Sequence, residues 1–111
     1  MALLPNYRNA FIAIEKLEEY CLNPSHPTGK NKALVFQSVF GFTQEDASLL
    51  KQIILNEIFN NDAIIDRADK FGERFTVDIK FRSLEGGNYI RTSWIIKKGE
   101  DFPRLVTCYV K

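Results

Sequence analysis

The stretch ERFTVDIKFR, residues 73–82, alternates strictly between polar and apolar side chains. Because successive side chains of a β-strand point to opposite sides of a sheet, this alternation predicts a strand with one apolar and one polar face. The apolar face carries Phe75, Val77, Ile79 and Phe81, and the polar face carries Arg74, Thr76, Asp78, Lys80 and Arg82. Such a strand needs neighbours for its backbone groups and a layer that covers its apolar side.

Two further segments continue the alternation, and each follows a turn signal. The sequences LEGGN, residues 84–88, and KGEDFP, residues 98–103, are rich in residues that turns favour. Residues 89–98 and 104–111 then place on the apolar face Ile90, Trp94, Ile96, Val106, Cys108 and Val110. They place on the opposite face Arg91, Ser93, Lys97, Leu105, Thr107 and Tyr109. With AIIDRAD, residues 63–69, as a weaker candidate for a first strand, the pattern predicts an antiparallel meander.

The first half of the chain has helical periodicity instead. Its apolar stripes are Ile14, Leu17 and Cys21 in residues 12–22; Ala33, Phe36, Val39 and Phe40 in residues 31–40; and Leu49, Leu50, Ile53, Ile54, Ile58 and Phe59 in residues 43–60. Gly41 stands where a helix end favours glycine. Thr43 and Asp46 resemble a capping box, which predicts the start of the third helix.

Helices followed by a meander predict an α+β fold, in which N-terminal helices pack on one face of a C-terminal antiparallel four-stranded sheet. We expect residues 1–111 to form a single domain, with a helical half at about 12–60 and a strand half at about 63–110. No apolar run approaches the roughly 20 residues of a membrane span, and the first residues do not resemble a signal peptide. We therefore expect a cytoplasmic protein without membrane contact.

The two cysteines, Cys21 and Cys108, stand far apart and within apolar patterns. We interpret both as buried free thiols. Because the chain has a single histidine and no closely spaced cysteine pair, no metal site is expected, and nothing in the sequence calls for another cofactor.

If the helices cover the apolar face, the opposite face of the sheet gathers most of the basic side chains of the strands. Its members are Arg74, Lys80, Arg82, Arg91 and Lys97, with Arg104 at the rim and Ser93, Thr107 and Tyr109 among them. The net charge is only +1, so this interpretation depends on how charge is distributed rather than on its total. A cationic face could be the footprint of RNA. The alternative is an ordinary solvated sheet face.

The only histidine, His26, lies in the turn LNPSHPTGKNKALVF, residues 22–36, close to Lys30 and Lys32. A turn needs proline and glycine, which are present, but it needs neither histidine nor lysine. A histidine side chain can serve as a general acid or base. The alternative is a turn residue whose ring bonds the local backbone.

Two stretches carry a resemblance to a known family. They are LPNYRNAFI…KLEEYCLNPSHPTGKNKALVFQSVFGFT and FTVDIKF…IRTSWIIKKGEDFPRLVTCYV, which span Leu4 to Val110. They resemble a small bacterial domain family of unknown function, whose pattern includes LNxxHPxGxxKAxxF and GEDxPRLVTxY. More distantly, the chain is similar to the superfamily of metal-independent RNases that includes barnase, EndoU, the tRNase colicins and RelE.

The distant resemblance implies an endoribonuclease-like toxin domain of a toxin–antitoxin system, which cleaves RNA by attack of the 2′-hydroxyl. The implied catalytic residues are His26, Lys30, Lys32, Arg91, Ser93, Thr107 and Tyr109, and the implied RNA-binding residues are Arg74, Lys80, Arg82 and Arg104. A mechanism that needs two histidines is not available to this chain. Its partners would be RNA and an acidic antitoxin or immunity protein.

A hypothesis of another class remains open at this point. The same sheet face could belong to a non-catalytic module, such as an antitoxin, an immunity protein or an adaptor, that binds a protein partner.

Overall fold

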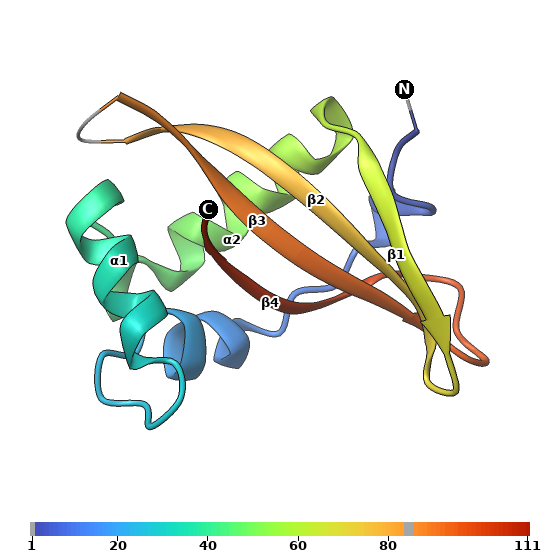
Figure 1. The fold of residues 1–111 in the computed structure, drawn as a ribbon, viewed down its shortest axis with the longest axis horizontal. Helices are drawn as coiled ribbons and strands as arrows, with labels where there is room; N and C mark the ends of the chain where they lie inside the picture. The colour runs from blue at the N-terminus through green and yellow to red at the C-terminus, as the bar shows by residue number, and fades with distance from the viewer. Residues whose placement is uncertain (1, 84–85) are drawn as a thin grey trace.

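A computed structural model of the chain describes the backbone of residues 2–83 and 86–111, and the side chains of these except at residues 82, 83, 86 and 87. Its strands are β1 (Ala63–Asp69), β2 (Gly72–Ser83), β3 (Gly86–Lys97) and β4 (Arg104–Val110). They form a four-stranded sheet in chain order, and each pairs antiparallel with the next (Figure 1). The predicted meander is confirmed, including its weaker first strand. The predicted turn LEGGN includes Leu84 and Glu85, which lie outside the described residues.

The helical half holds η2 (Lys16–Cys21), α1 (Lys30–Phe40) and α2 (Ala47–Glu57), with single turns at η1 (Tyr7–Asn9), η3 (Gln44–Asp46) and η4 (Ile58–Asn60). Gly41 ends α1 with a φ of 76°, a left-handed conformation that glycine adopts without strain. The predicted capping box is present, because the Thr43 amide donates to Asp46 Oδ2 over 2.8 Å and the Thr43 side chain accepts in return.

The helical half covers only one side of the sheet. Figure 1 shows α2 behind β2 and β3, while α1 and η2 lie beyond the edge strand β4. The largest fully buried side chains come from both halves and include Leu17, Phe36, Leu50, Ile54, Val77, Ile79, Ile90 and Trp94. The predicted α+β fold is therefore confirmed, and no helix of residues 2–83 and 86–111 lies on the opposite side of the sheet. We call that side the open face.

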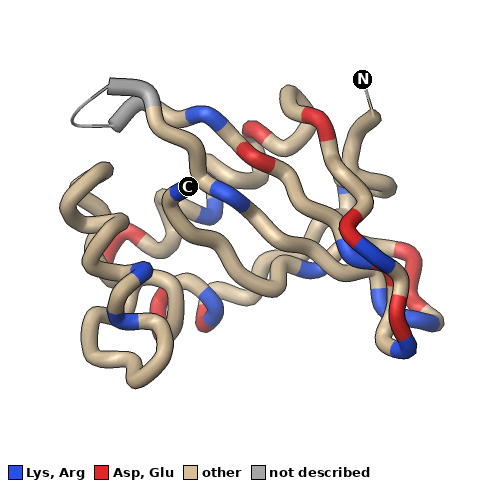
Figure 2. Tube along the Cα trace, viewed as in Figure 1, with Lys and Arg blue, Asp and Glu red and all other residues tan. Residues whose placement is uncertain are grey.

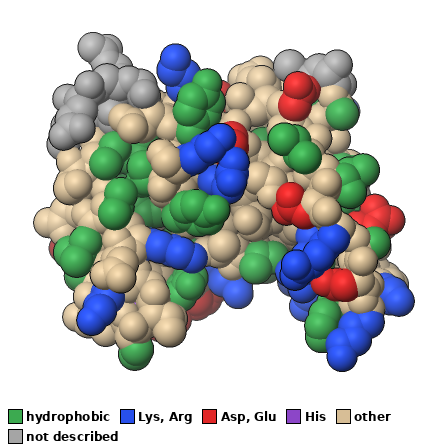
Figure 3. Space-filling view, in the orientation of Figure 1, with side chains coloured by type: hydrophobic (Ala, Val, Ile, Leu, Met, Phe, Trp, Pro, Cys, Tyr) green, Lys and Arg blue, Asp and Glu red, His purple; other side chains and the backbone are tan. Residues whose placement is uncertain are grey.

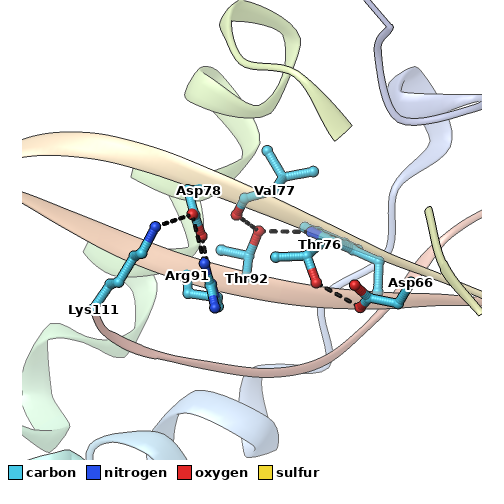
Figure 4. A network of polar contacts seen from close by, with 8 residues as sticks. Asp66, Thr76, Val77, Asp78, Arg91, Thr92 and Lys111 are labelled. Carbon is cyan, nitrogen blue, oxygen red and sulfur yellow. Dashed lines mark hydrogen bonds and ion pairs between the residues drawn. The ribbon is translucent and has the colours of Figure 1, made fainter. Parts of the chain in front are cut away.

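Two polar groups in the centre of the core, an indole N–H and a hydroxyl, are both hydrogen-bonded. The Trp94 indole N–H donates to Thr92 Oγ1 over 2.8 Å, and that hydroxyl donates to the Val77 carbonyl oxygen over 2.6 Å (Figure 4). Thr92 and Trp94 are both fully buried. The bridge lets a tryptophan fill the core without leaving its N–H unpaired.

One face assignment from the sequence is wrong. Ser93 pairs with Thr107 and Trp94 pairs with Leu105, so β4 has one extra residue between these pairs. Leu105 is only 4% exposed, whereas Val106 is partly exposed and borders hollows on the open face. A β-bulge reverses the alternation locally, so Leu105 rather than Val106 fills the core.

A second correction concerns the third helix. Leu49 is 52% exposed and Phe59 is 45% exposed, although both were expected on its buried side. The buried side chains of α2 are Ala47, Leu50 and Ile54, and this stripe leaves Leu49 turned outward. Phe59 follows the end of α2 and belongs to η4, so the helical period no longer places it.

We predict that Thr92→Val lowers the free energy of unfolding by about 1–3 kcal/mol, because a methyl group replaces the hydroxyl that pairs the buried indole N–H. Thr76→Val is the matched control, since the Thr76 hydroxyl bonds Asp66 on the solvated side. Urea unfolding followed by Trp94 fluorescence measures both variants. Equal losses would show that the buried bridge contributes nothing specific.

Candidate functional site

The open face carries arginines that are already held by carboxylates. Arg91 Nε and Nη2 donate to the two carboxylate oxygens of Asp78 over 2.9 and 3.0 Å. Arg74 pairs with Asp69 at 2.9 Å, and Arg104 pairs with Glu100 at 2.8 Å. Figure 3 shows basic and acidic side chains interspersed on this face. The face is therefore more mixed in charge than the sequence pattern suggested.

Asp78 is the acidic centre of this network (Figure 4). The hydrogen bonds from Arg91 hold the pKa of Asp78 below its usual value, and a further bond from Lys111 Nζ at 3.0 Å acts in the same direction against partial burial. The hydrogen bond to Asp78 raises the pKa of Arg91, and a hydrogen bond with Tyr109 adds to this effect. Arg91 is thus a fixed, fully charged group whose position is set by Asp78.

A lysine of α1 joins the helical half to this network. The Lys32 Nζ lies 5.4 Å from the centre of the Tyr20 ring and 5.2 Å from that of Tyr109. It also donates to the Tyr20 hydroxyl over 3.4 Å. Tyr109 faces Arg91 across β3 and β4. Tyr20, Lys32, Tyr109 and Arg91 form a contiguous group, which we call the junction cluster.

The single histidine adjoins this cluster through Tyr20. The two rings meet edge to face, with centroids 4.8 Å apart. His26 Nδ1 accepts the backbone N–H groups of Thr28 at 3.1 Å and Gly29 at 2.9 Å. These bonds assign the neutral ring proton to Nε2. The sequence left open whether the His26 ring bonds the local backbone or has a catalytic role. Its Nδ1 atom bonds the local backbone, while the Nε2–H group can still donate a hydrogen bond.

Gly29 explains why the turn can approach Tyr20 so closely. A Cβ atom at this position would lie 2.6 Å from the Tyr20 carbonyl oxygen, which is too close for any other residue without a shift of backbone. Gly29 therefore allows the turn to pack against Tyr20, which both His26 and Lys32 contact.

Two cysteines lie beside the junction cluster. Cys21 and Cys108 are buried and free, as expected from the sequence. Hydrogen bonds from Cys108 lower the pKa of Cys21, and the bond to Cys21 together with burial raises the pKa of Cys108. Cys21 Sγ also lies 3.8 Å from Thr107 Oγ1. The sequence did not predict that Tyr20 contacts Lys32 or that Cys21 contacts Thr107, because nothing local indicates that η2 packs against β4.

The remaining residues of the predicted site are spread over the sheet and the start of α1. Ser93 and Thr107 are cross-strand partners next to the junction cluster. Lys30 begins α1 and Lys80 lies on β2; both are exposed, and neither makes an ion pair among the described residues. Arg74 and Arg104 line a separate hollow around Ile95. Arg82 lies on β2, but its side chain is outside the described residues.

Within residues 2–83 and 86–111, no group of three or more His, Cys, Asp and Glu side chains is arranged to hold a metal ion. No helix in this part of the chain is both long and apolar enough to span a membrane.

The fold and this face define a small α+β domain whose meander is covered by helices on one side and open on the other. The chain belongs to the family of domains of unknown function DUF6883, whose model matches residues 3–111. The predicted resemblance to a small uncharacterised family is thereby confirmed. No curated protein and no solved structure matches the chain. The more distant resemblance to metal-independent RNases stays a prediction.

We predict that Asp78→Asn lowers the free energy of unfolding by roughly 1–2 kcal/mol at pH 7, because Arg91 and Lys111 lose a charged acceptor. The pKa of Asp78 is depressed in the folded state, so its contribution is complete above the usual value of 3.8 and is lost as the pH falls through the lowered value. Urea midpoints of both proteins between pH 7 and pH ~3 should therefore converge on acidification.

The control for this experiment is Asp62→Asn, because Asp62 is exposed and makes no ion pair with a described residue. A difference between wild type and Asp78→Asn that stays constant over the whole pH range would mean that the carboxylate charge does not stabilise the fold.

Proposed function

We propose that the chain is a metal-independent endoribonuclease-like domain, of the kind found in toxin–antitoxin systems, whose site is the junction cluster. The observation that carries the proposal is the position of Lys32 Nζ between the rings of Tyr20 and Tyr109. This position brings a cation of the helical half to Arg91 and Tyr109 of the sheet. RNA cleavage by internal attack requires such a convergence of cations and proton-transfer groups around one phosphate.

The cations have the most direct role in this proposal. A phosphorane formed by attack of the 2′-hydroxyl carries extra negative charge, which Lys32 and Arg91 would stabilise. Asp78 keeps the Arg91 guanidinium in place, so little reorganisation is needed during the reaction. The neighbouring hydroxyls of Ser93 and Thr107 would donate to phosphate oxygens.

The proton-transfer roles follow from the hydrogen bonds around His26. A general base needs a free ring lone pair, and the one at Nδ1 is engaged by two backbone amides. His26 would therefore donate from Nε2–H to a phosphate oxygen. Tyr109, as its phenolate, would accept the 2′-hydroxyl proton and then return it, as the phenol, to the departing 5′ oxygen; alternatively, its ring would stack on a base.

The open face supports binding of a single strand around this site. Tyr89 is 44% exposed on β3, and Lys80 lies opposite it on β2. Lys80 makes no ion pair with the residues that the structure describes. An exposed aromatic ring beside such a cation on an open sheet suits base stacking and phosphate contact.

We expect Lys32→Gln to slow RNA cleavage by about 10²–10³-fold, because it removes charge stabilisation from the transition state. Tyr109→Phe should reduce the rate if its hydroxyl moves a proton, while His26→Gln should cost about tenfold or less. Lys98→Gln, an exposed lysine of the β3–β4 turn, is the control. The assay follows RNA in EDTA and identifies 2′,3′-cyclic phosphate ends.

Cleavage that depends on an added metal ion would contradict the mechanism. Cleavage by Lys32→Gln at the wild-type rate would remove the junction cluster from consideration. If wild type cuts neither free RNA nor RNA on ribosomes, the enzyme proposal fails as a whole.

The second candidate is a protein-binding module that uses the same open face. The observation that favours it is the pairing of Arg74, Arg91 and Arg104 with carboxylates, which leaves a face of mixed charge. Interspersed charges of both signs suit an interface with another protein better than contact with a polyanion.

RNA binding separates the two candidates. We expect wild type to bind single-stranded RNA with an affinity that falls steeply with salt, and Lys80→Gln to reduce the logarithmic salt slope by about 0.7, the value of one phosphate contact. Lys98→Gln again serves as the control. Electrophoretic or fluorescence titrations at several salt concentrations measure the slope, and absence of binding at low salt would favour the protein-binding module.

A further inference from the structure

The hollow around Ile95 lies on the open face, at the end away from α1. It has a volume of about 400 Å³ and is bordered by the N-terminal segment, the β1–β2 turn and the ends of β2, β3 and β4. The bulge in β4 contributes to it, because Val106 is turned toward this side of the sheet. Figures 2 and 3 show basic and acidic residues gathered at this end of the molecule.

The floor of the hollow is apolar. Ile95 belongs to the open face, since it lies between Arg74 and Arg104 in the cross-strand ladder, yet it is only 7% exposed. The segment around Phe11 runs alongside β4, with the Leu105 amide donating to the Phe11 carbonyl over 2.9 Å, and Phe11 lines the hollow together with Ile95. Phe11 is 45% exposed and Phe71 is 58% exposed, so two aromatic rings border a concave apolar surface.

The rim of the hollow is cationic. Its charged lining residues are Lys16, Arg74, Lys97 and Arg104, and no carboxylate lines it among the described residues. Asp69 and Glu100 orient the two arginines from outside the lining. Lys16 and Lys97 make no ion pair within the described part of the chain. After the stronger effect of Arg104, the Lys97 ammonium also helps to hold the pKa of Glu100 below its usual value.

We propose that this hollow, formed by Phe11, Phe71, Ile95 and Val106 beneath Lys16 and Lys97, binds a small organic anion: an aromatic or branched apolar body with one carboxylate. The apolar body would lie on Ile95 and Val106, and the carboxylate would reach the lysines. The volume is in the range of small-molecule sites, which combine an apolar lining with a few polar groups. The proposal concerns the end of the face opposite the junction cluster and does not rest on RNA cleavage.

The probe is 1-naphthaleneacetate, and 1-naphthaleneacetamide is its uncharged match of nearly the same shape. We expect the acid to bind with a Kd on the order of 1 mM, as its size allows, and to shift the backbone amide signals of Ile95 and Val106 in heteronuclear NMR spectra. The amide should bind at least about fivefold more weakly, because it lacks the charge that the lysines attract.

Three variants and one control locate the site. Lys16→Gln and Lys97→Gln should each weaken binding of the acid by up to about fivefold and leave binding of the amide unchanged. Val106→Asp, which places a carboxylate on the floor, should weaken binding of the acid about tenfold or more. The control Lys98→Gln removes a neighbouring cation that does not line the hollow. Because the lysine variants change only exposed side chains, they test the proposal even if Val106→Asp does not fold.

Equal affinity for the acid and the amide would overturn the proposed recognition of an anion. Absence of shifts at Ile95 and Val106 with about 5 mM probe would overturn the site itself. A loss of affinity in Lys98→Gln as large as in Lys97→Gln would show attraction by general surface charge and would contradict a defined site.

Discussion

The packing around Trp94 sets the arrangement on which both faces of the sheet depend. The ring is fully buried, its N–H donates to the Thr92 hydroxyl, and that hydroxyl donates to the Val77 carbonyl oxygen of β2. Opposite this position, β4 supplies Leu105 to the core and carries Val106 as an extra residue. A bulge increases the local bend and twist of a strand, so β4 follows the surface of the core here. The largest side chain of the core and the irregularity of the open face therefore occur at the same place.

That irregularity divides the open face into two regions. After the bulge, Thr107 and Tyr109 pair regularly with β3. Thr107 contacts Cys21 of the helical half, and Tyr109 contacts Lys32. On the other side of it, Val106 and Ile95 form an apolar floor among cations. A smaller hollow of about 340 Å³, lined by Arg74, Ser93, Val106 and Thr107, among others, lies between them. The two proposed sites thus share one rigid sheet while drawing on different connecting segments.

The sequence predicted most of the fold because alternation and helical spacing are local signals. The strict pattern of residues 73–82, Gly41 and the Thr43 box each correspond to a feature of the structure. The exchange of Leu105 and Val106 could not be predicted, since both residues are apolar and an extra residue in a strand leaves no local mark. The exposure of Leu49 depends on which stripe of α2 meets the sheet, and this is a property of tertiary packing.

The candidate site was predictable in its residue types but not in its contacts. Alternation placed Arg91, Ser93 and Tyr109 together, and the turn drew attention to His26 and Lys32. Whether a cation is free or paired depends on how the strands and turns fold. Arg91 meets Asp78 on the neighbouring strand, and Arg74 meets Asp69 across the β1–β2 turn. Salt-bridged arginines are positioned donors with part of their charge neutralised, whereas Lys32, Lys80 and Lys97 make no ion pair among the described residues. In both proposed sites, the arginines would therefore define geometry, and the lysines would supply most of the attraction for an anion.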